Sequence, residues 1–197
     1  MRPRFPEQSS PIKRSSSGCS IDARWIPRRF QQNERSDHIG PDEGTGLEDR
    51  STYAGIIVDG QHIHPAAFRV AISAKGTDRL MLVTDAMPTV GGDDRGFVLQ
   101  GRAIRREGDR LVSEDGVLAG SMLTMATAVA NAIEQGRLTL AAAVEMATST
   151  PARFLGLGSE TGAIAPGLRA DLIAMRDDFT VARSWIGGVS QNEVLTA

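Results

Sequence analysis

Cysteine is nearly absent from this sequence: its 197 residues contain one, Cys19. A single cysteine excludes an internal disulfide framework and a zinc site built from cysteines. No apolar run reaches the roughly 18 residues that a membrane span needs, and no hydrophobic stretch follows the basic residues near the N-terminus. We therefore expect a soluble, cytoplasmic protein without a secretory signal.

The sequence also lacks a large excess of charge of either sign. Its formal net charge is −2 and its isoelectric point is about 5.9. These values argue against binding to nucleic acid or to a membrane surface through charge. The hydrophobic fraction of 41% is sufficient for a core, and the length allows one domain or one and a part.

The first 46 residues differ from the rest of the chain. They are rich in Pro, Ser, Arg and Gln and show neither helical nor strand periodicity, so we expect a disordered tail. Asp37 and His38 could be metal ligands, but an isolated pair in such a stretch is more typical of a loop. Because the composition changes abruptly near residue 47, we hypothesise a shifted reading frame or a misplaced start, which the upstream nucleotide sequence would test.

The most informative stretch is Leu80 to Ala86, with the sequence LMLVTDA. Its apolar residues predict a buried parallel strand that ends at Thr84 and Asp85. In (β/α)-barrel enzymes the C-terminal ends of the strands carry the catalytic groups. Asp85 is therefore a candidate catalytic residue, although an aspartate at this position could instead cap the next helix or fix the loop.

A second strand is expected just before this one, at Ala54 to Val58, followed by a loop with His62 and His64. Pro65 then opens a helix that Gly76 ends. A strand, a helix and a strand in this order form the repeat of a parallel α/β architecture. The two strands should therefore bring both histidines and Asp85 to the same rim.

The remainder predicts hairpins, two helices and a small β unit. Turn signals separate three strands at 97–100, 102–106 and 110–112. The segment LAGSMLTM should then lead into a helix that reaches Gln135, with Ser121 as its N-cap or with the preceding loop at a ligand. The further elements expected are a helix at 139–148, a short helix from Pro151, and strands at 170–175, 181–186 and 193–196.

Five motifs in this order resemble the C-terminal half of the N-acetylglucosamine-6-phosphate deacetylases, which belong to the amidohydrolase superfamily. They are DGQHIHP, LVTDAM, LAGSMLTM, ATSTPARFLGL and G-x-I-x-x-G-x-x-A-D-L, and the similarity covers roughly residues 47 to 197. The resemblance implies a metal-dependent hydrolase, with zinc or iron, that converts N-acetylglucosamine 6-phosphate into glucosamine 6-phosphate and acetate.

The resemblance also implies roles for individual residues. Asp85 matches the catalytic aspartate, which takes a proton from water and passes it to the leaving amine. His62 matches a histidine that contacts the substrate, while His64 matches no position with an assigned role. The other positions that match the substrate site are Asp59, Gly60, Gln61, Leu118, Ala119 and Gly120.

The sequence departs from the family in one important respect. The metal ligands of the family are a glutamate and two histidines on earlier barrel strands, and residues 1 to 46 contain no match to them. We therefore expect little turnover from this chain alone. Two alternatives are a non-catalytic module that docks on a full-length relative, and a hydrolase of another acylated amine or cyclic amide.

The expected fold class is α/β: the C-terminal part of a (β/α)8 TIM-like barrel, with a small β domain at the C-terminus and a disordered N-terminal tail. The corresponding boundaries are 1–46 for the tail, 47–160 for the partial barrel with a hairpin insertion at about 94–117, and 161–197 for the β unit. The expected partner is the small sugar phosphate, without nucleic acid or membrane, and homo-oligomers are possible.

Overall fold

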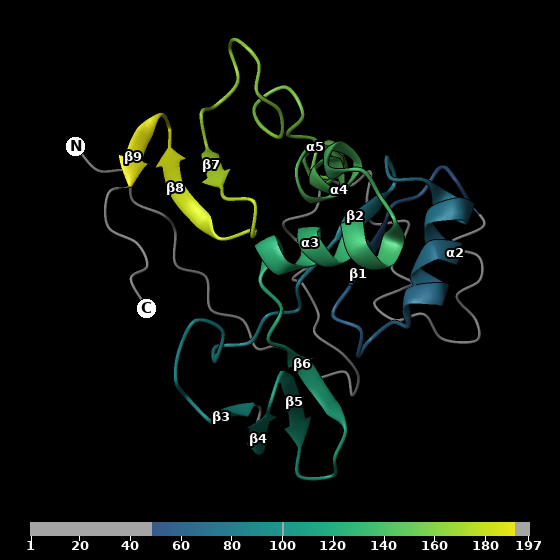
Figure 1. Cartoon of the computed structure of the whole chain (residues 1–197), viewed down its shortest axis with the longest axis vertical. Coiled ribbons are helices and arrows are strands. Elements are labelled where there is room, and N and C mark those ends of the chain that lie inside the picture. The colour runs from purple at the N-terminus through teal and green to yellow at the C-terminus, as the bar shows by residue number, and fades with distance from the viewer. Residues whose placement is uncertain (1–48, 100, 192–197) are drawn as a thin grey trace, which may run out of the picture. The chain divides into compact units, whose positions relative to one another are not determined.

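The computed structural model describes residues 49–99 and 101–191 and has a mixed α/β architecture (Figure 1). Strands β1 (Ala54–Ile56) and β2 (Leu80–Leu82) pair in parallel, with Ala54 opposite Leu80. Helix α2 (Pro65–Lys75) connects them and ends at Gly76. The predicted strand, helix and strand are confirmed, although β1 is two residues shorter than expected.

Three further helices pack around this pair of strands: α3 (Met125–Gly136), α4 (Leu140–Ala147) and α5 (Ser149–Phe154). The hydrophobic core forms where α2, α3 and α4 meet β1 and β2, and Phe68, Leu80 and Met146 are at most 1% exposed. Burial of each such side chain contributes about 1.5–3 kcal/mol. The predicted helix at 139–148 is confirmed, and the short helix begins two residues before Pro151.

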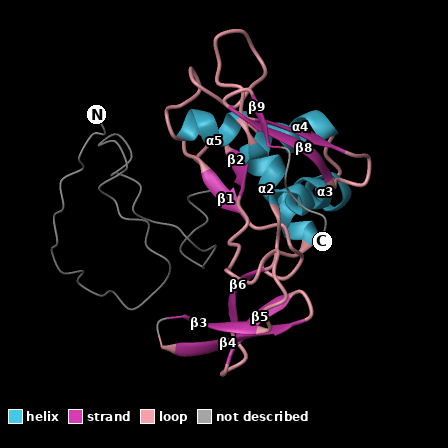
Figure 2. Ribbon diagram, turned by 90° about the vertical axis from the view of Figure 1, so that its left-hand side faces the viewer, coloured by secondary structure: helices cyan, strands magenta, loops and turns pink. Residues whose placement is uncertain are grey.

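The predicted hairpins are confirmed as an antiparallel sheet in the order β3-β4-β5-β6 (Figure 2). Its strands are β3 (Gly96–Leu99), β4 (Arg102–Glu107), β5 (Arg110–Ser113) and β6 (Leu118–Ser121). An isolated parallel bridge joins Ala86 to Ser121, so the end of β6 lies beside the segment that follows β2.

The prediction of a helix capped by Ser121 is wrong. Leu118–Ser121 is the strand β6, and α3 begins after Thr124, whose side-chain oxygen accepts a hydrogen bond from the backbone N–H of Thr127 at 3.1 Å. A short apolar run fits a strand as well as a helix, and periodicity alone could not separate them. The predicted end of this helix near Gln135 is confirmed.

A third sheet has the order β7-β8-β9 and consists of β7 (Leu172–Met175), β8 (Val181–Ile186) and β9 (Val189–Gln191). The strand expected at 181–186 is confirmed, and β7 begins two residues later than expected. The strand expected at 193–196 and the tail of residues 1–46 lie outside the described residues. Within the described part of the chain, no helix is long and apolar enough to cross a membrane.

Candidate active site

The loop after β1 is organised by the carboxylate of Asp59. Its Oδ1 accepts hydrogen bonds from the backbone N–H groups of Gln61 and His62, each at 2.9 Å. Gly60, between Asp59 and Gln61, has a φ of +74°, in the left-handed region. The other carboxylate oxygen, Oδ2, lies 2.7 Å from Nδ1 of His62. One aspartate thus sets both the backbone of the loop and the orientation of the histidine ring.

The second nitrogen of the His62 ring, Nε2, lies near Asp85. Nε2 of His62 lies 3.9 Å from Oδ2 of Asp85, and the side chains of the two residues are 23% and 36% exposed. The structure therefore brings together two of the predicted site residues, one from the loop after each strand. His62 lies between two carboxylates and remains accessible to a small molecule.

The electrostatics of this group favour a charged histidine. The hydrogen bond with Asp59 raises the pKa of His62 against the opposing effect of burial, and the nearby charges of Asp59 and Asp85 raise it further. Burial would raise the pKa of Asp59, but hydrogen bonds from the His62 ring and from the backbone N–H groups of His62 and Gln61 outweigh it. The pKa of Asp59 is consequently lowered, and the pair of carboxylates stabilises the protonated form of the ring.

Asp85 follows β2 and does not start a helix, so the interpretation of Asp85 as a helix cap is wrong. Its backbone adopts a φ of +50°, a conformation that residues other than glycine rarely adopt. The backbone is held by β6, because the N–H of Ser121 donates to the carbonyl of Asp85 at 2.8 Å. Its carboxylate lies within ion-pair distance of the His62 ring.

His64 does not join this group, although it lies two residues after His62. It is the N-cap of α2, and its Nδ1 accepts a hydrogen bond from the backbone N–H of Ala66 at 3.1 Å. Pro65 occupies the first position of the helix, where no N–H is required. His64 therefore caps α2, and of the two histidines His62 is the one that approaches Asp85.

The three remaining predicted substrate residues, Leu118, Ala119 and Gly120, lie on β6. A Cβ atom at Gly120 would lie 2.4 Å from side-chain atoms of Met87, so β6 runs directly against the segment that follows Asp85. This position is compatible with the backbone contacts that the resemblance implies.

Sequence reasoning missed one residue that holds the backbone just before Asp59. Asn131, on α3, donates a hydrogen bond from its side-chain amide to the carbonyl of Val58 at 2.7 Å. Val58 is fully buried and directly precedes Asp59. An asparagine within the apolar run 128–133 of α3 was the available signal, but its partner lies 73 positions away.

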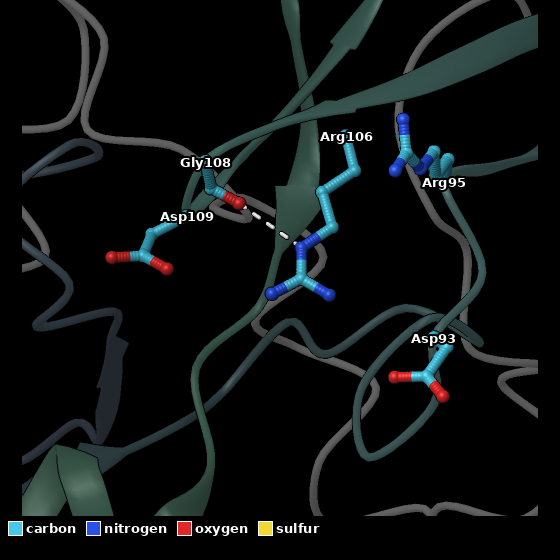
Figure 3. Close-up of a pocket in the computed structure, with 5 residues that line it drawn as sticks. All are labelled: Asp93, Arg95, Arg106, Gly108 and Asp109. Carbon is cyan, nitrogen blue, oxygen red and sulfur yellow. Dashed lines mark hydrogen bonds between the residues drawn. The ribbon is translucent and has the colours of Figure 1, made fainter.

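A surface hollow on the antiparallel sheet lies apart from these residues (Figure 3). Two arginines and two aspartates line it, and Nε of Arg106 donates to the carbonyl of Gly108 at 3.0 Å. None of the predicted site residues contributes to its lining. The described residues also contain no group of three or more histidine, cysteine, aspartate or glutamate side chains placed to hold a metal ion. They therefore do not fit a complete metal site of the kind that the resemblance implies.

Comparison with known proteins identifies the family of the chain. A sequence model described as "Amidohydrolase family" matches residues 38–190. The chain therefore belongs to the amidohydrolase family. Within that family, its relatives are deacetylases of N-acetylated amino-sugar 6-phosphates, which confirms the resemblance found in the motifs.

Two curated relatives and one solved structure illustrate the similarity. The chain is 46% identical over 145 residues to the N-acetylgalactosamine-6-phosphate deacetylase of Shewanella sp. (strain ANA-3), covering 74% of this chain and 36% of that protein. It is 33% identical to the N-acetylglucosamine-6-phosphate deacetylase of Vibrio furnissii, with the same coverage of both proteins. The chain thus spans little more than a third of the length of these relatives.

The solved structure is an aspartate-to-alanine variant of N-acetyl-D-glucosamine-6-phosphate deacetylase from Mycobacterium smegmatis, in complex with N-acetyl-D-glucosamine-6-phosphate. It superposes with a TM-score of 0.70 at 32% identity and covers 77% of this chain and 40% of that one.

Proposed function

We propose that the described residues form the proton-transfer and substrate-contacting part of a deacetylase that removes acetate from an N-acetylhexosamine 6-phosphate. With N-acetylglucosamine 6-phosphate as substrate, the products are glucosamine 6-phosphate and acetate. The observation that carries the proposal is the approach of His62 Nε2 to Asp85 Oδ2, 3.9 Å apart, at the ends of two neighbouring parallel strands. In an α/β barrel this edge is where catalytic groups gather.

We also propose that β1, β2 and their helices are the C-terminal part of a (β/α)8 barrel and that β7–β9 belong to a small β domain beside it. The parallel pairing of β1 and β2 across the helix α2 supports the first assignment. The likeness to the mycobacterial deacetylase supports both, since it extends over 77% of the chain.

Asp85 has the central chemical role in this proposal. Its carboxylate accepts a proton from the water whose oxygen attacks the acetamide carbonyl, and it then delivers that proton to the nitrogen as the C–N bond breaks. General acid–base catalysis of this kind contributes about 10²–10⁴-fold to the rate.

His62 acts as the substrate-contacting group beside this base. Asp59 holds its Nδ1, which leaves Nε2 directed toward Asp85 and toward a bound sugar. Because Nδ1 is engaged by Asp59, Nε2 is the ring atom available to hydrogen-bond the substrate. Leu118, Ala119 and Gly120 would provide backbone contacts on the other side. No step is assigned to a metal, because the described residues do not fit its site.

A chimera tests this proposal. Residues 49–197 would replace the corresponding segment of the Shewanella relative, and acetate release would be measured from N-acetylglucosamine 6-phosphate and N-acetylgalactosamine 6-phosphate side by side. We expect turnover of at least one epimer, with Asp85→Asn lowering kcat by about 10²–10⁴-fold. Undiminished hydrolysis by the Asp85→Asn chimera would overturn the proposal.

The unmodified chain is the companion experiment. We expect it to release little acetate with zinc or iron present, because the described residues supply no three-ligand group. Rapid acetate release by the purified chain would contradict this expectation.

A further inference from the structure

Asp85 is held in an unusual backbone conformation. Among the described residues, three that are not glycine have a positive φ: Asp85, Arg137 and Phe179. Arg137 is the C-cap of α3, where the left-handed conformation is common. Asp85 instead lies three residues after the buried strand β2, and such outliers persist only where surrounding structure determines them. Contacts from neighbouring residues must therefore hold the chain in this turn.

Ser121 supplies most of the contacts that define it. Its N–H donates to the carbonyl of Asp85 at 2.8 Å, and its carbonyl accepts from the N–H of Met87 at 3.2 Å. Its hydroxyl donates to the carbonyl of Thr84. One residue of β6 thus bonds to the residue before Asp85, to Asp85 and to the second residue after it.

The hydroxyl of Ser121 is both a hydrogen-bond donor and an acceptor. It donates to Thr84 and also accepts a hydrogen bond from the N–H of Leu123 at 2.9 Å. Ser121 is 1% exposed, so water cannot readily replace the hydroxyl if it is removed. A purely apolar side chain here would leave the carbonyl of Thr84 and the N–H of Leu123 without these bonds.

We propose that Ser121 is a positioning residue for Asp85: by holding the backbone on both sides of it, Ser121 fixes the turn that presents the carboxylate to His62. This inference rests on the proposed function in which Asp85 transfers the proton. It adds a requirement that the motif did not indicate, namely that a buried hydroxyl on β6, outside the substrate contacts, keeps the base in place. Ser121 itself touches neither substrate nor the reacting atoms.

The chain offers a matched control in Ser113. It is also a buried serine of the same sheet, 7% exposed, and its hydroxyl both donates to and accepts from the backbone of Val117. It has no recorded contact with the turn at Asp85. Loss of its hydroxyl should therefore reproduce the general effect of an unsatisfied buried backbone group without changing the turn.

The test uses NMR on the full chain with four forms: wild type, Ser121→Ala, Ser121→Thr and Ser113→Ala. A positive φ gives a strong nuclear Overhauser effect between the amide and α protons of the same residue. We expect this signal at Asp85 in wild type, its loss in Ser121→Ala, its recovery in Ser121→Thr, and no change in Ser113→Ala. The pKa of His62 should fall in Ser121→Ala alone, because the Asp85 carboxylate moves away from the ring.

An unchanged Asp85 signal together with an unchanged His62 titration in Ser121→Ala would overturn the proposal. If Ser121→Ala does not fold, Ser121→Cys keeps the shape with a much weaker donor. A folded Ser121→Cys with the wild-type signal would then overturn it, and loss of the signal would support it.

Kinetics of the same variants in the Shewanella chimera separate this inference from the proposed function. We expect Ser121→Ala to lower kcat by up to about 100-fold with little change in KM, because a displacement near 1 Å of a catalytic group has an effect of this size. Ser121→Thr should restore most of kcat. If no form of the chimera hydrolyses either sugar phosphate, the proposed function fails, while the NMR comparison still decides the positioning role.

Discussion

The two regions that meet at Asp85 are stabilised in different ways. β1, β2 and the helices around them bury a continuous apolar cluster, in which Phe68 and Met146 are inaccessible to water. The antiparallel sheet β3–β6 is far more exposed, and Val98 at its edge is 71% exposed. Burial therefore fixes the strand β2 that precedes Asp85, whereas hydrogen bonds at the end of β6 fix the turn that contains it. The first is spread over many side-chain contacts, whereas the second depends on a few hydrogen bonds of Ser121.

Substitutions of one large side chain in each region should give the largest contrast. Phe68→Ala removes a fully buried ring and should lower the free energy of unfolding by about 3–5 kcal/mol. Val98→Ala, on the exposed edge strand, should lower it by less than about 1 kcal/mol. Urea denaturation followed by circular dichroism measures both values. Equal losses would show that the sheet is as tightly packed as the helical region.

The same contrast explains what could be predicted from the sequence. The apolar runs at 54–58 and 80–83 and the glycine and proline signals of α2 indicated the parallel unit, and so placed His62 and Asp85 at one edge. These features are local, and burial enforces them. The residues of β6 were predicted as the loop and cap before a helix, because their strand conformation depends on pairing with β5, which lies outside the segment.

Long-range hydrogen bonds were beyond sequence reasoning for a related reason. Ser121 bonds to a carbonyl 37 positions away and Asn131 to one 73 positions away. No periodicity of either segment contains that information. The motifs indicated candidate site residues, whereas the hydrogen bonds that hold their backbone in place became apparent from the fold.

Two glycines allow the effect of the close contact between β6 and Met87 on stability to be distinguished from the effect of backbone strain. Gly120 and Gly101 both have a positive φ, +88° and +81°. A Cβ at Gly120 would meet Met87 at 2.4 Å, whereas one at Gly101 would meet no atom within 4 Å. Alanine at Gly101 should therefore cost about 1–2 kcal/mol from strain alone, and alanine at Gly120 about 1–3 kcal/mol more from overpacking.

Thermal unfolding of the two glycine variants would test this difference. Amide spectra should in addition show a disturbed Asp85 in Gly120→Ala and an unchanged Asp85 in Gly101→Ala. Equal stability losses in the two variants would indicate that Met87 adjusts freely, and β6 would then not be tightly packed against the turn.

A smaller effect is expected at the start of α2, on the side of the helical region. His64→Ala removes the N-cap acceptor and should cost about 1 kcal/mol, whereas His64→Asn should retain most of the stability, because asparagine is a strong N-cap residue. The spectrum of His62 should be unchanged in both variants. A change at His62 would mean that the two histidines act together after all, contrary to the assignment of His64 to the helix.

The smallest effect concerns pH, and Asp59→Asn isolates it. In wild type the pKa of His62 is raised from 6.5, chiefly by the hydrogen bond to Asp59. A raised pKa in the folded state contributes stability that is complete below the unfolded pKa and is lost as the pH rises through the folded value. Wild-type stability should therefore decline with increasing pH above about 6.5, and the decline should be weaker in Asp59→Asn.

At acidic pH the same substitution should affect the pH dependence of stability with the opposite sign. The pKa of Asp59 is lowered from 3.8, so its contribution is present above that value and is lost as the pH falls through the folded pKa. Asp59→Asn should therefore lose less stability on acidification than wild type, and the His62 ring should titrate at a lower pH. NMR titration with urea denaturation at each pH measures both changes. An unchanged His62 titration in Asp59→Asn would mean that the Asp85 carboxylate, rather than Asp59, raises the pKa of the ring.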